Sequence, residues 1–153
     1  MENIILRPAR IEDLPTLYEF EQGIVNTERA FDPTLKSGLI NYYDLKEYVE
    51  CENIEVIVAE VDGELAASGY VKIKQAQRYL SFEQYAYVGF MYVKPQHRRK
   101  GISHMIIKEL VAWAKSRGLI EIRLDVYEQN DGAVAAYENI GFSKHLIEMR
   151  MAI

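Results

Sequence analysis

Apolar residues change their spacing repeatedly along the chain, and each spacing predicts a helix or a strand. Helices place apolar side chains three and four positions apart, whereas strands alternate them or carry a short continuous run. The pattern predicts strands over residues 3–7, 54–61, 64–74, 85–93, 120–126 and 142–151. It predicts helices from Asp13 to about Val25, over 42–50, from about Gly101 to Gly118, and over 131–139.

The order of these elements predicts the fold class. One strand is followed by two helices and three strands, and then by helix, strand, helix and strand. This order is typical of a mixed α/β (α+β) fold in which helices flank a central sheet. The pair Asp62-Gly63 between two apolar runs predicts a tight hairpin, and the strand–helix–strand unit over 85–126 predicts two parallel strands. The chain has 153 residues without a repeat or a linker, so we expect a single domain over residues 1–153.

Composition and charge narrow the classes of function. The net charge is −5, and this disfavours a nucleic-acid binder because phosphate neutralisation needs clustered cations. No apolar run approaches the roughly 18 residues of a membrane span, and the first residues lack the pattern of a signal peptide. The single cysteine, Cys51, cannot form an intrachain disulfide and has no histidine near it in the sequence, so we expect a packing residue. These features predict a cytoplasmic protein that acts neither on nucleic acid nor at a membrane.

The clearest candidate chemistry lies between the predicted strand that ends at Val93 and the helix that begins near Gly101. Such a junction presents unpaired N–H groups and the positive end of a helix dipole, which together bind anions. Gly101 lets an anion approach the backbone, and Arg98, Arg99 and Lys100 add positive charge. The junction predicts a diphosphate site, and the alternative is a solvated basic turn. A Walker A loop or a dinucleotide-binding loop does not fit, because only one glycine is present.

Two segments resemble the motifs of the GNAT superfamily of N-acetyltransferases. The stretch from Val93 to Ser103 is similar to motif A, Gln/Arg-x-x-Gly-x-Gly/Ala, with Arg98, Gly101 and Ser103 in register. Ser103 departs from the Gly or Ala of the family, but serine is small enough to keep the site open. Residues 130–142 are similar to motif B, Asn-x-x-Ala-x-x-x-Tyr-x-x-x-Gly-Phe. The order of elements also agrees, so the resemblance covers the whole chain.

The resemblance implies a GNAT-like acyl-CoA N-acyltransferase fold and an enzyme that moves an acetyl group from acetyl-CoA directly to a primary amine. The pantetheine arm is then expected beside 91–93, and the pyrophosphate on the N–H groups of 99–104. The residues expected to bind acetyl-CoA are Met91, Tyr92, Val93, Arg98, Arg99, Lys100, Gly101, Ile102, Ser103, His104, Asn130 and Tyr137. No metal is expected, because no histidine pair has ligand spacing.

The resemblance also suggests catalytic groups. Tyr137 is expected to act as the general acid toward the departing thiolate, and the alternative is a packing aromatic beside Phe142. The general base is Asp125 on the strand over 120–126, or Glu83 just before the strand over 85–93, or a distant carboxylate reached through water. The N–H of Met91 is expected to polarise the thioester carbonyl.

The acceptor amine is expected between the segments 24–43 and 75–84, which the family varies most. Carboxylates and aromatic rings in these segments suit a cationic amine, although ordinary loop residues are the alternative. These side chains are Glu28, Phe31, Asp32, Tyr42, Tyr43, Tyr79 and Phe82. A polyamine-like amine, an aminoglycoside-like antibiotic, an amino acid and a peptide N-terminus all remain open.

Two other functions and a dimer are also considered. One function is a catalytically silent acyl-CoA-binding sensor, and the other is a nucleic-acid-binding domain that uses residues 97–100. Dimers are common among the proteins that the chain resembles, so a homodimer is one expectation.

Overall fold

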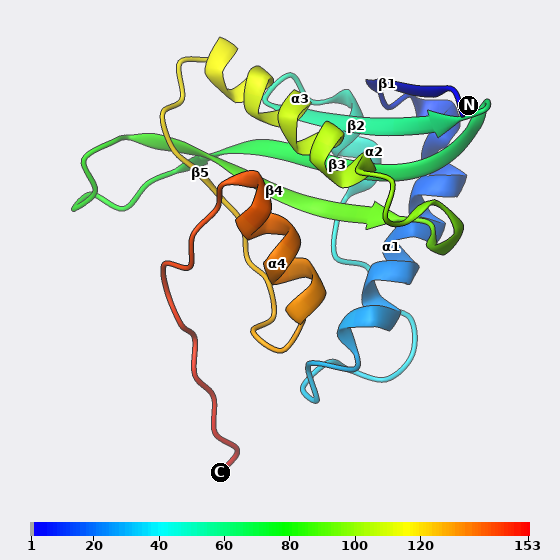
Figure 1. Cartoon of the computed structure of the whole chain (residues 1–153). Helices are drawn as coiled ribbons and strands as arrows, with labels where there is room; N and C mark the ends of the chain where they lie inside the picture. The colour runs from blue at the N-terminus through cyan, green and yellow to red at the C-terminus, as the bar shows by residue number, and fades with distance from the viewer. Residues whose placement is uncertain (1) are drawn as a thin grey trace.

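A mixed five-stranded sheet forms the centre of the computed structural model, which describes residues 2–153 (Figure 1). The strands follow one another in the sheet in chain order, and every neighbouring pair is antiparallel except β4 and β5, which are parallel. The strands are β1 (Ile4–Pro8), β2 (Ile54–Val61), β3 (Glu64–Gln75), β4 (Gln84–Val93) and β5 (Ile122–Arg123).

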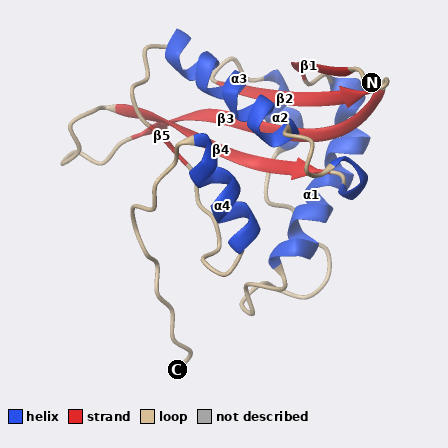
Figure 2. Ribbon diagram, viewed as in Figure 1, coloured by secondary structure: helices blue, strands red, loops and turns tan. Residues whose placement is uncertain are grey.

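Helices cover both faces of this sheet (Figure 2). The α-helices are α1 (Leu14–Glu28), α2 (Leu45–Glu50), α3 (Ile102–Ser116) and α4 (Asp131–Ile140), and the 3-10 turns are η1 (Ile11–Asp13) and η2 (Pro95–His97). α1 and α2 pack on one face of the sheet, and α3 packs on the other. α4 follows β5 and, in the view of Figure 1, lies across the middle of β4, on the side where α3 lies.

The continuous apolar run of β2 explains the two-sided packing. Val56 and Val58 point toward α1 and α2, where they join a core with Leu17 and Phe20. Ile57 and Ala59 point to the other face, where they join the core that includes Ile106 and Leu110 of α3. The part of a strand that is covered on both faces needs apolar side chains at successive positions, which is why residues 56–59 do not alternate.

The sequence predictions for the first three quarters of the chain are confirmed. The sheet with flanking helices, the hairpin at Asp62-Gly63 and the parallel pairing of the strands around α3 are all present. The second helix is shorter than predicted, because Asp44 caps it by accepting a hydrogen bond from the N–H of Glu47 at 3.2 Å. No helix within residues 2–153 is long and apolar enough to cross a bilayer.

The last quarter of the chain differs from prediction. The strand predicted over 120–126 is reduced to the two residues of β5, and the strand predicted over 142–151 is absent. Residues 143–153 instead run as an extended tail away from the domain (Figure 1). Apolar alternation gives a segment the tendency to form a strand, but the strand exists only where a neighbouring backbone pairs with it.

A charged cluster ties the start of the chain to the sheet. Arg7 on β1 donates to both carboxylate oxygens of Asp13 at 2.8 and 3.0 Å and to Glu60 on β2 at 3.1 Å. Asp13 also accepts from the N–H of Arg10 at 2.7 Å, so the cluster fixes the turn that begins α1. The hydrogen bonds from Arg7 hold the pKa of the Asp13 carboxyl below its usual range.

We expect Asp13→Asn to lower the free energy of unfolding at pH 7 by about 2–4 kcal/mol, because it leaves a nearly buried guanidinium without its main partner. Since the folded-state pKa of Asp13 is lowered, its contribution is present above the ordinary value near 4 and is lost as the pH falls through the lowered pKa. Denaturant titrations at several pH values measure this difference, and the exposed neighbour Glu12→Gln is the control, with an expected change within about 0.5 kcal/mol. Equal losses for both variants would contradict the role of the cluster.

Candidate active site

The sheet opens between β4 and β5, and this opening defines the candidate site. The two strands pair only at Ala86↔Ile122 and Tyr87↔Arg123, whereas β4 stays paired with β3 as far as Val93. Beyond Tyr87 the edge of β4 that faces β5 is therefore not paired with another strand among residues 2–153, and its one side-chain contact there is the carbonyl of Val93, which accepts from Arg98. Predicted cofactor residues Met91, Tyr92 and Val93 lie on this stretch, where free N–H and C=O groups can pair with a linear, amide-containing ligand.

A β-bulge sets the point where β4 changes direction. The register with β3 shifts between Ser68 and Tyr70, and Phe90 on β4 takes a left-handed conformation with φ of 56°. The fully buried Ser68 donates its hydroxyl hydrogen bond to the carbonyl of Phe90 at 3.0 Å. Opposite the bulge, a Cβ on Gly69 would lie 2.5 Å from the sulfur of Met91, so a larger residue there would have to displace the Met91 side chain. The bulge is thus built into both strands.

The loop after β4 forms a turn at the start of α3 whose geometry suits an anion, and we refer to it as the anion-binding turn. Arg99 and Gly101 both have positive φ, 65° and 77°, and a turn of this kind aims successive N–H groups into one concavity. Gly101 is the N-cap residue and offers no side chain to the first N–H groups of α3, which stay available for a ligand. Ile102 is 2% exposed and anchors the turn in the core, and the predicted residues Ser103 and His104 follow in the first turn of the helix.

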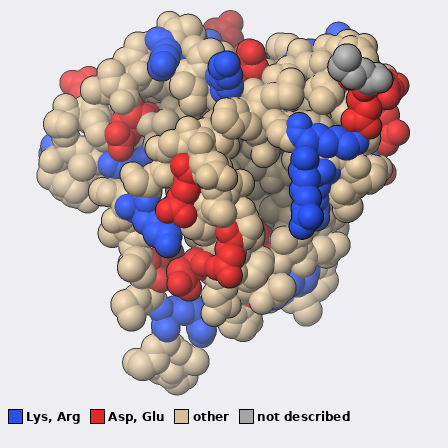
Figure 3. Space-filling model, in the orientation of Figure 1, with Lys and Arg blue, Asp and Glu red and all other residues tan. Residues whose placement is uncertain are grey.

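The cations of this loop have different roles. Arg98 turns back and donates to the carbonyl of Val93 at 2.9 Å, so it stabilises the strand end. Lys100 binds Glu2 at 2.7 Å. Arg99 has no ion-pair or hydrogen-bond partner among residues 2–153 and is free to meet an anion. Figure 3 shows the basic side chains of this loop as a column beside a recess in the surface.

A groove between α3 and α4 continues from this loop. It is lined by His104, Ile107, Lys108, Val111 and Ile140. The first four residues come from α3 and the last from α4, so the groove lies between the two predicted motifs. Its apolar floor and its two basic rims suit a ligand with both apolar and anionic parts.

α4 carries the two predicted residues of the second motif. Asn130 caps the helix by accepting from the N–H of Ala133 at 3.3 Å. Tyr137 packs edge-on against Phe142, with 6.0 Å between ring centroids. This contact is the one expected of a packing aromatic, and the role of Tyr137 as a general acid stays a prediction. Burial, with a smaller effect of the charge of Glu28, raises the pKa of Tyr137 to about 12. The hydroxyl of Tyr137 therefore keeps its proton at neutral pH.

The two predicted bases lie in different places. Asp125 accepts a hydrogen bond from the hydroxyl of Tyr87 at 2.9 Å, across the gap where β4 and β5 part. Glu83 lies before the first residue of β4, at the tip of the β3–β4 hairpin (Figure 1). A strand rises about 3.3 Å per residue, so Glu83 is roughly 20 Å from the bulge and is not brought together with Tyr137.

A cluster of acidic and aromatic side chains stands on the other side of the opening, and we name it the acidic cluster. Its members come from the end of α1, the loop after it and the loop after β5. They are Glu28, Phe31, Asp32, Tyr42 and Tyr127.

Direct contacts hold the acidic cluster together. The hydroxyl of Tyr127 donates to Asp32 at 2.5 Å, and the ring of Tyr127 stacks on Phe31 with 6.3 Å between centroids. Burial, followed by the charge of Asp32, raises the pKa of the Glu28 carboxyl, while the hydrogen bonds of Asp32 lower its own pKa. The charge of Glu28 also adds, after burial, to the raised pKa of Tyr137.

The rest of the predicted acceptor set is dispersed. Tyr43 is packed in the core against Tyr70 and Phe90. Tyr79 is 82% exposed and Phe82 packs on Tyr85, both at the hairpin end of the molecule far from the acidic cluster (Figure 1). The prediction that segments 24–43 and 75–84 form one site within the chain is therefore wrong, because the long β3–β4 hairpin carries the second segment away.

Sequence reasoning missed three residues. Tyr127 closes the acidic cluster, Tyr87 holds Asp125, and Ser68 fixes the bulge. Tyr127 lies 95 positions from its partner Asp32, so no local pattern could have joined them. Ser68 gave a weak signal as a polar residue within the apolar run of β3.

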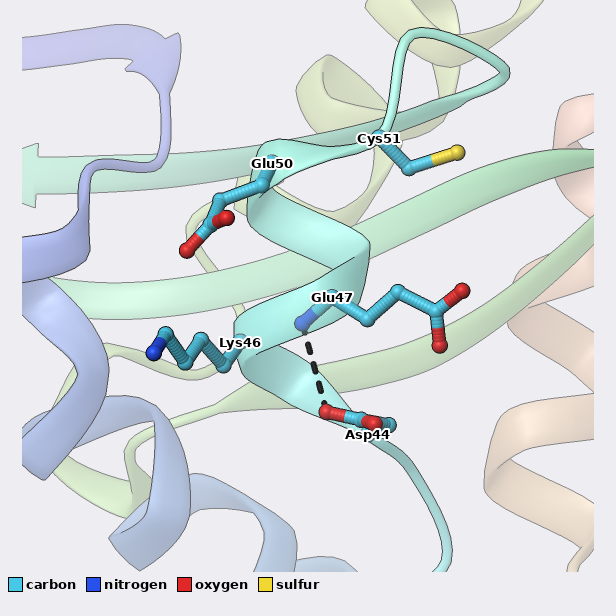
Figure 4. A pocket seen from close by; sticks show the side chains of 5 residues that line it. All are labelled: Asp44, Lys46, Glu47, Glu50 and Cys51. Atoms are coloured by element: carbon cyan, nitrogen blue, oxygen red, sulfur yellow. Dashed lines mark hydrogen bonds between the residues drawn. The ribbon is translucent and has the colours of Figure 1, made fainter.

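A surface depression beside α2 does not belong to this site. It is lined by Asp44, Lys46, Glu47, Glu50 and Cys51 (Figure 4). The side chains point in different directions, and the bond drawn between them is the cap of α2. Cys51 is half-buried at the end of the helix, and no group of three or more potential metal ligands gathers among residues 2–153.

Comparison with known proteins finds similarity to N-acetyltransferases. The model of the Acetyltransferase (GNAT) family matches residues 19–142. Over 55 residues the chain is 33% identical to a [ribosomal protein bS18]-alanine N-acetyltransferase of Salmonella typhimurium, a match that covers 36% of this chain and 37% of that protein. Over 59 residues it is 29% identical to a thialysine N-epsilon-acetyltransferase of Caenorhabditis elegans, covering 39% of this chain and 37% of the relative. In these matches the chain spans little more than a third of each relative.

The fold also matches a solved structure along its whole length. A predicted acetyltransferase from Clostridium acetobutylicum, crystallised with acetyl-CoA, superposes with a TM-score of 0.72 at 17% identity. The match covers 99% of this chain and 96% of that chain. Identity this low shows the shared fold.

We expect Gly101→Asp to weaken binding of coenzyme A by at least tenfold, because a carboxylate and a Cβ would stand where the N–H groups meet a phosphate. Titration calorimetry with coenzyme A measures the loss. Gly118→Asp is a matched control, since Gly118 has nearly the same φ, 78°, at the other end of α3 and an equally open surrounding. Equal affinities for the two variants would place the anion site elsewhere.

Proposed function

The chain belongs to the GNAT family of acetyltransferases, and from this premise we propose that it transfers the acetyl group of acetyl-CoA to a primary amine of cationic character. The observation that carries the proposal is the opening of the sheet between β4 and β5, with the anion-binding turn of α3 at one end and the acidic cluster at the other. A long ligand that combines amides with a diphosphate fits along this line, and an amine fits where the carboxylates gather.

Residues of the opening supply the binding groups for acetyl-CoA. The N–H groups of the turn at 99–104 and the side chain of Arg99 are placed to hold the diphosphate. The free edge of β4 at 91–93 is placed to pair with the pantetheine amides. Asn130 contributes through the cap of α4, and the groove between α3 and α4 covers the ligand.

The reaction is direct acyl transfer. The amine nitrogen attacks the thioester carbonyl, a C–N bond forms, the C–S bond breaks, and the thiolate leaves. A thiol has an ordinary pKa near 8.5, whereas Tyr137 titrates at about 12. Complete proton transfer from Tyr137 is therefore uphill, and Tyr137 acts by donating a hydrogen bond that stabilises the leaving thiolate. The backbone N–H of Met91, next to the bulge, polarises the carbonyl.

Glu28 is the carboxylate that we assign to accept the proton of the attacking amine. It lies in the acidic cluster, its pKa is raised by burial, and its charge reaches Tyr137. A base with a raised pKa holds the proton better than an ordinary carboxylate does. Asp125 is the second candidate and is held by Tyr87 at the gap, while Glu83 lies too far along the hairpin for direct contact.

The acidic cluster favours an amine that is positively charged before it reacts. Glu28 and Asp32 attract an ammonium group, and the rings of Phe31 and Tyr127 offer it apolar and π surfaces. The relatives named for thialysine and for a ribosomal-protein alanine act on amines of a small molecule and of a protein. We place the acceptor of this chain among small cationic amines and peptide N-termini.

A panel of amines tests the activity. We expect acetyl-CoA-dependent turnover with at least one class among diamines and polyamines, aminoglycosides, amino acids and short peptides. Tyr137→Phe should lower kcat by roughly tenfold to a hundredfold and leave the affinity for coenzyme A within about twofold, because the hydrogen bond acts on the leaving group. Tight binding of coenzyme A without turnover on every class would indicate the acyl-CoA sensor instead.

The pH dependence of kcat tests the base. Glu28 must be ionised to accept a proton, so activity should fall as the pH drops through its raised pKa, above the ordinary value near 4.5. Glu28→Gln should remove this inflection and lower kcat at neutral pH by about a hundredfold. The control is Glu19→Gln on the exposed face of α1, which should behave like the unmodified protein. If Glu28→Gln left the pH dependence of kcat unchanged, Glu28 would not be the general base and Asp125 would be the remaining candidate.

A further inference from the structure

Two lysines stand together on the face of the sheet that α1 and α2 cover. Lys72 and Lys74 follow Tyr70 at intervals of two along β3, so their side chains leave the strand on the same face as the buried ring of Tyr70. Both lysines are half-buried, and neither forms an ion pair among residues 2–153. We call Lys72 and Lys74 the lysine pair.

Tyrosine rings hold the two ammonium groups in place. The Nζ of Lys72 lies 5.4, 5.7 and 6.0 Å from the ring centroids of Tyr48, Tyr70 and Tyr87, respectively. It also donates to the hydroxyl of Tyr48 at 3.2 Å. The Nζ of Lys74 lies 4.0 Å from the centroid of Tyr87, so both ammonium groups gather at one ring. A lysine on an open strand extends its ammonium group into water, whereas these two fold over aromatic faces.

The positive charge of the lysine pair is not neutralised within the described chain. A ring face attracts a cation but carries no net charge. The carboxylate that contacts this set of rings is Asp125, which accepts from the hydroxyl of Tyr87 at 2.9 Å and pairs with neither lysine. The neighbouring cation Arg123 differs, because Glu121 pairs with it at 3.0 Å. Two like charges beside one ring repel each other, and an anion between them would relieve this repulsion.

The lysine pair is separate from the anion-binding turn. Lys72 pairs with Tyr87 in the sheet, and β4 continues from Tyr87 to Val93 before the turn begins, a rise of about 20 Å. The turn also leads into α3, which packs on the opposite face of the sheet. A diphosphate on the turn is therefore out of reach of the two ammonium groups, which need another anion.

One short loop connects the lysine pair to the acidic cluster. Asp125 bonds to Tyr87 beside the lysine pair, and Tyr127, two positions later, bonds to Asp32 in the acidic cluster. Two residues of chain span at most about 7 Å, so the backbone anchors of the two regions are neighbours. A positive region and a negative region thus meet along the loop after β5.

We propose that the lysine pair binds an anionic group of the acceptor, a carboxylate or a phosphate, while the acidic cluster binds its ammonium group. This inference rests on the proposed acetyl transfer, and it narrows the acceptor to amines that carry both charges. Amino acids, peptides with an acidic group near the N-terminus and phosphorylated amines belong to this class. Diamines, polyamines and aminoglycosides leave the lysine pair without a partner and are poorer acceptors.

Matched amines that differ only in the anion test the substrate class. L-Lysine differs from cadaverine by one carboxylate, and O-phosphoethanolamine differs from ethanolamine by one phosphoryl group. We expect kcat/KM to be about tenfold higher, or more, for the anionic member of at least one pair, because it gains charge-assisted hydrogen bonds. The pair that shows this preference identifies the group as carboxylate or phosphate. Ratios near one in both pairs would overturn the proposal and leave acetyl transfer intact.

Substitutions of the lysine pair test the residues. Lys74→Gln should raise KM for the preferred anionic amine about tenfold and leave kcat, and KM for its matched amine, within about twofold, because the contact is made equally before and during the reaction. Lys72→Gln should act in the same direction, and Lys74→Arg should keep the preference because it keeps the charge. The control is Lys115→Gln, on the exposed side of α3. A preference for the anionic amine that survives both glutamine variants would overturn the assignment.

Equilibrium binding separates this inference from the proposed function. NMR titration of the protein loaded with coenzyme A measures the affinity for the same four amines without turnover. If no amine were acetylated, the proposed function would fail, yet binding of an anionic amine that Lys74→Gln weakens about tenfold would still support the lysine pair. Equal affinity of Lys74→Gln and the unmodified protein, or no binding of either anionic amine, would overturn it.

Discussion

The parting of β4 from β5 is the constraint on which the rest of the structure depends. Two parallel strands that stayed paired would satisfy each other's backbone and leave no room for a ligand. Here pairing stops after Tyr87, and the bulge at Phe90 redirects β4 while Ser68 and Gly69 on β3 hold it in place. Because β4 keeps its bonds to β3, the opening does not weaken the sheet core. The backbone groups of β4 that β5 leaves unpaired are the ones that we propose as the binding surface.

The elements on either side of the opening are held in place by the two hydrophobic cores, one on each face of the sheet. α3 packs through Ile106 and Leu110, which are fully buried, so the first turn of the helix is held rigidly next to the end of β4. α1 packs on the other face and carries Glu28 at its last residue, directly before the loop of Asp32. The anion-binding turn and the acidic cluster are therefore positioned by two different cores, on opposite faces of one strand.

How far the sequence predicts this molecule depends on the range of the interaction. The helix after Gly101, the hairpin at Asp62-Gly63 and the turn before that helix rest on neighbours within a few residues, and all are present. That the turn binds an anion stays a prediction. The bulge joins Ser68 and Phe90, which are 22 positions apart, and Tyr127 bonds to Asp32, which is 95 positions away. Neither contact could be predicted from a local sequence pattern. The prediction that segment 75–84 joins the acceptor site was wrong for the same reason. The length of the β3–β4 hairpin decides where this segment lies, and that length is set by pairing between distant residues.

The missing strand at the end of the chain follows from the same opening. Once β5 separates from β4 it retains only two residues of pairing, too few to hold a further strand against the cost of ordering its backbone. The alternation of the tail is nevertheless that of a strand, so the apolar pattern of residues 142–151 is suited to a pairing that the described chain does not supply. A pattern of apolar residues predicts which face a strand would bury, whereas the strand itself depends on a neighbouring backbone that the opening of the sheet takes away.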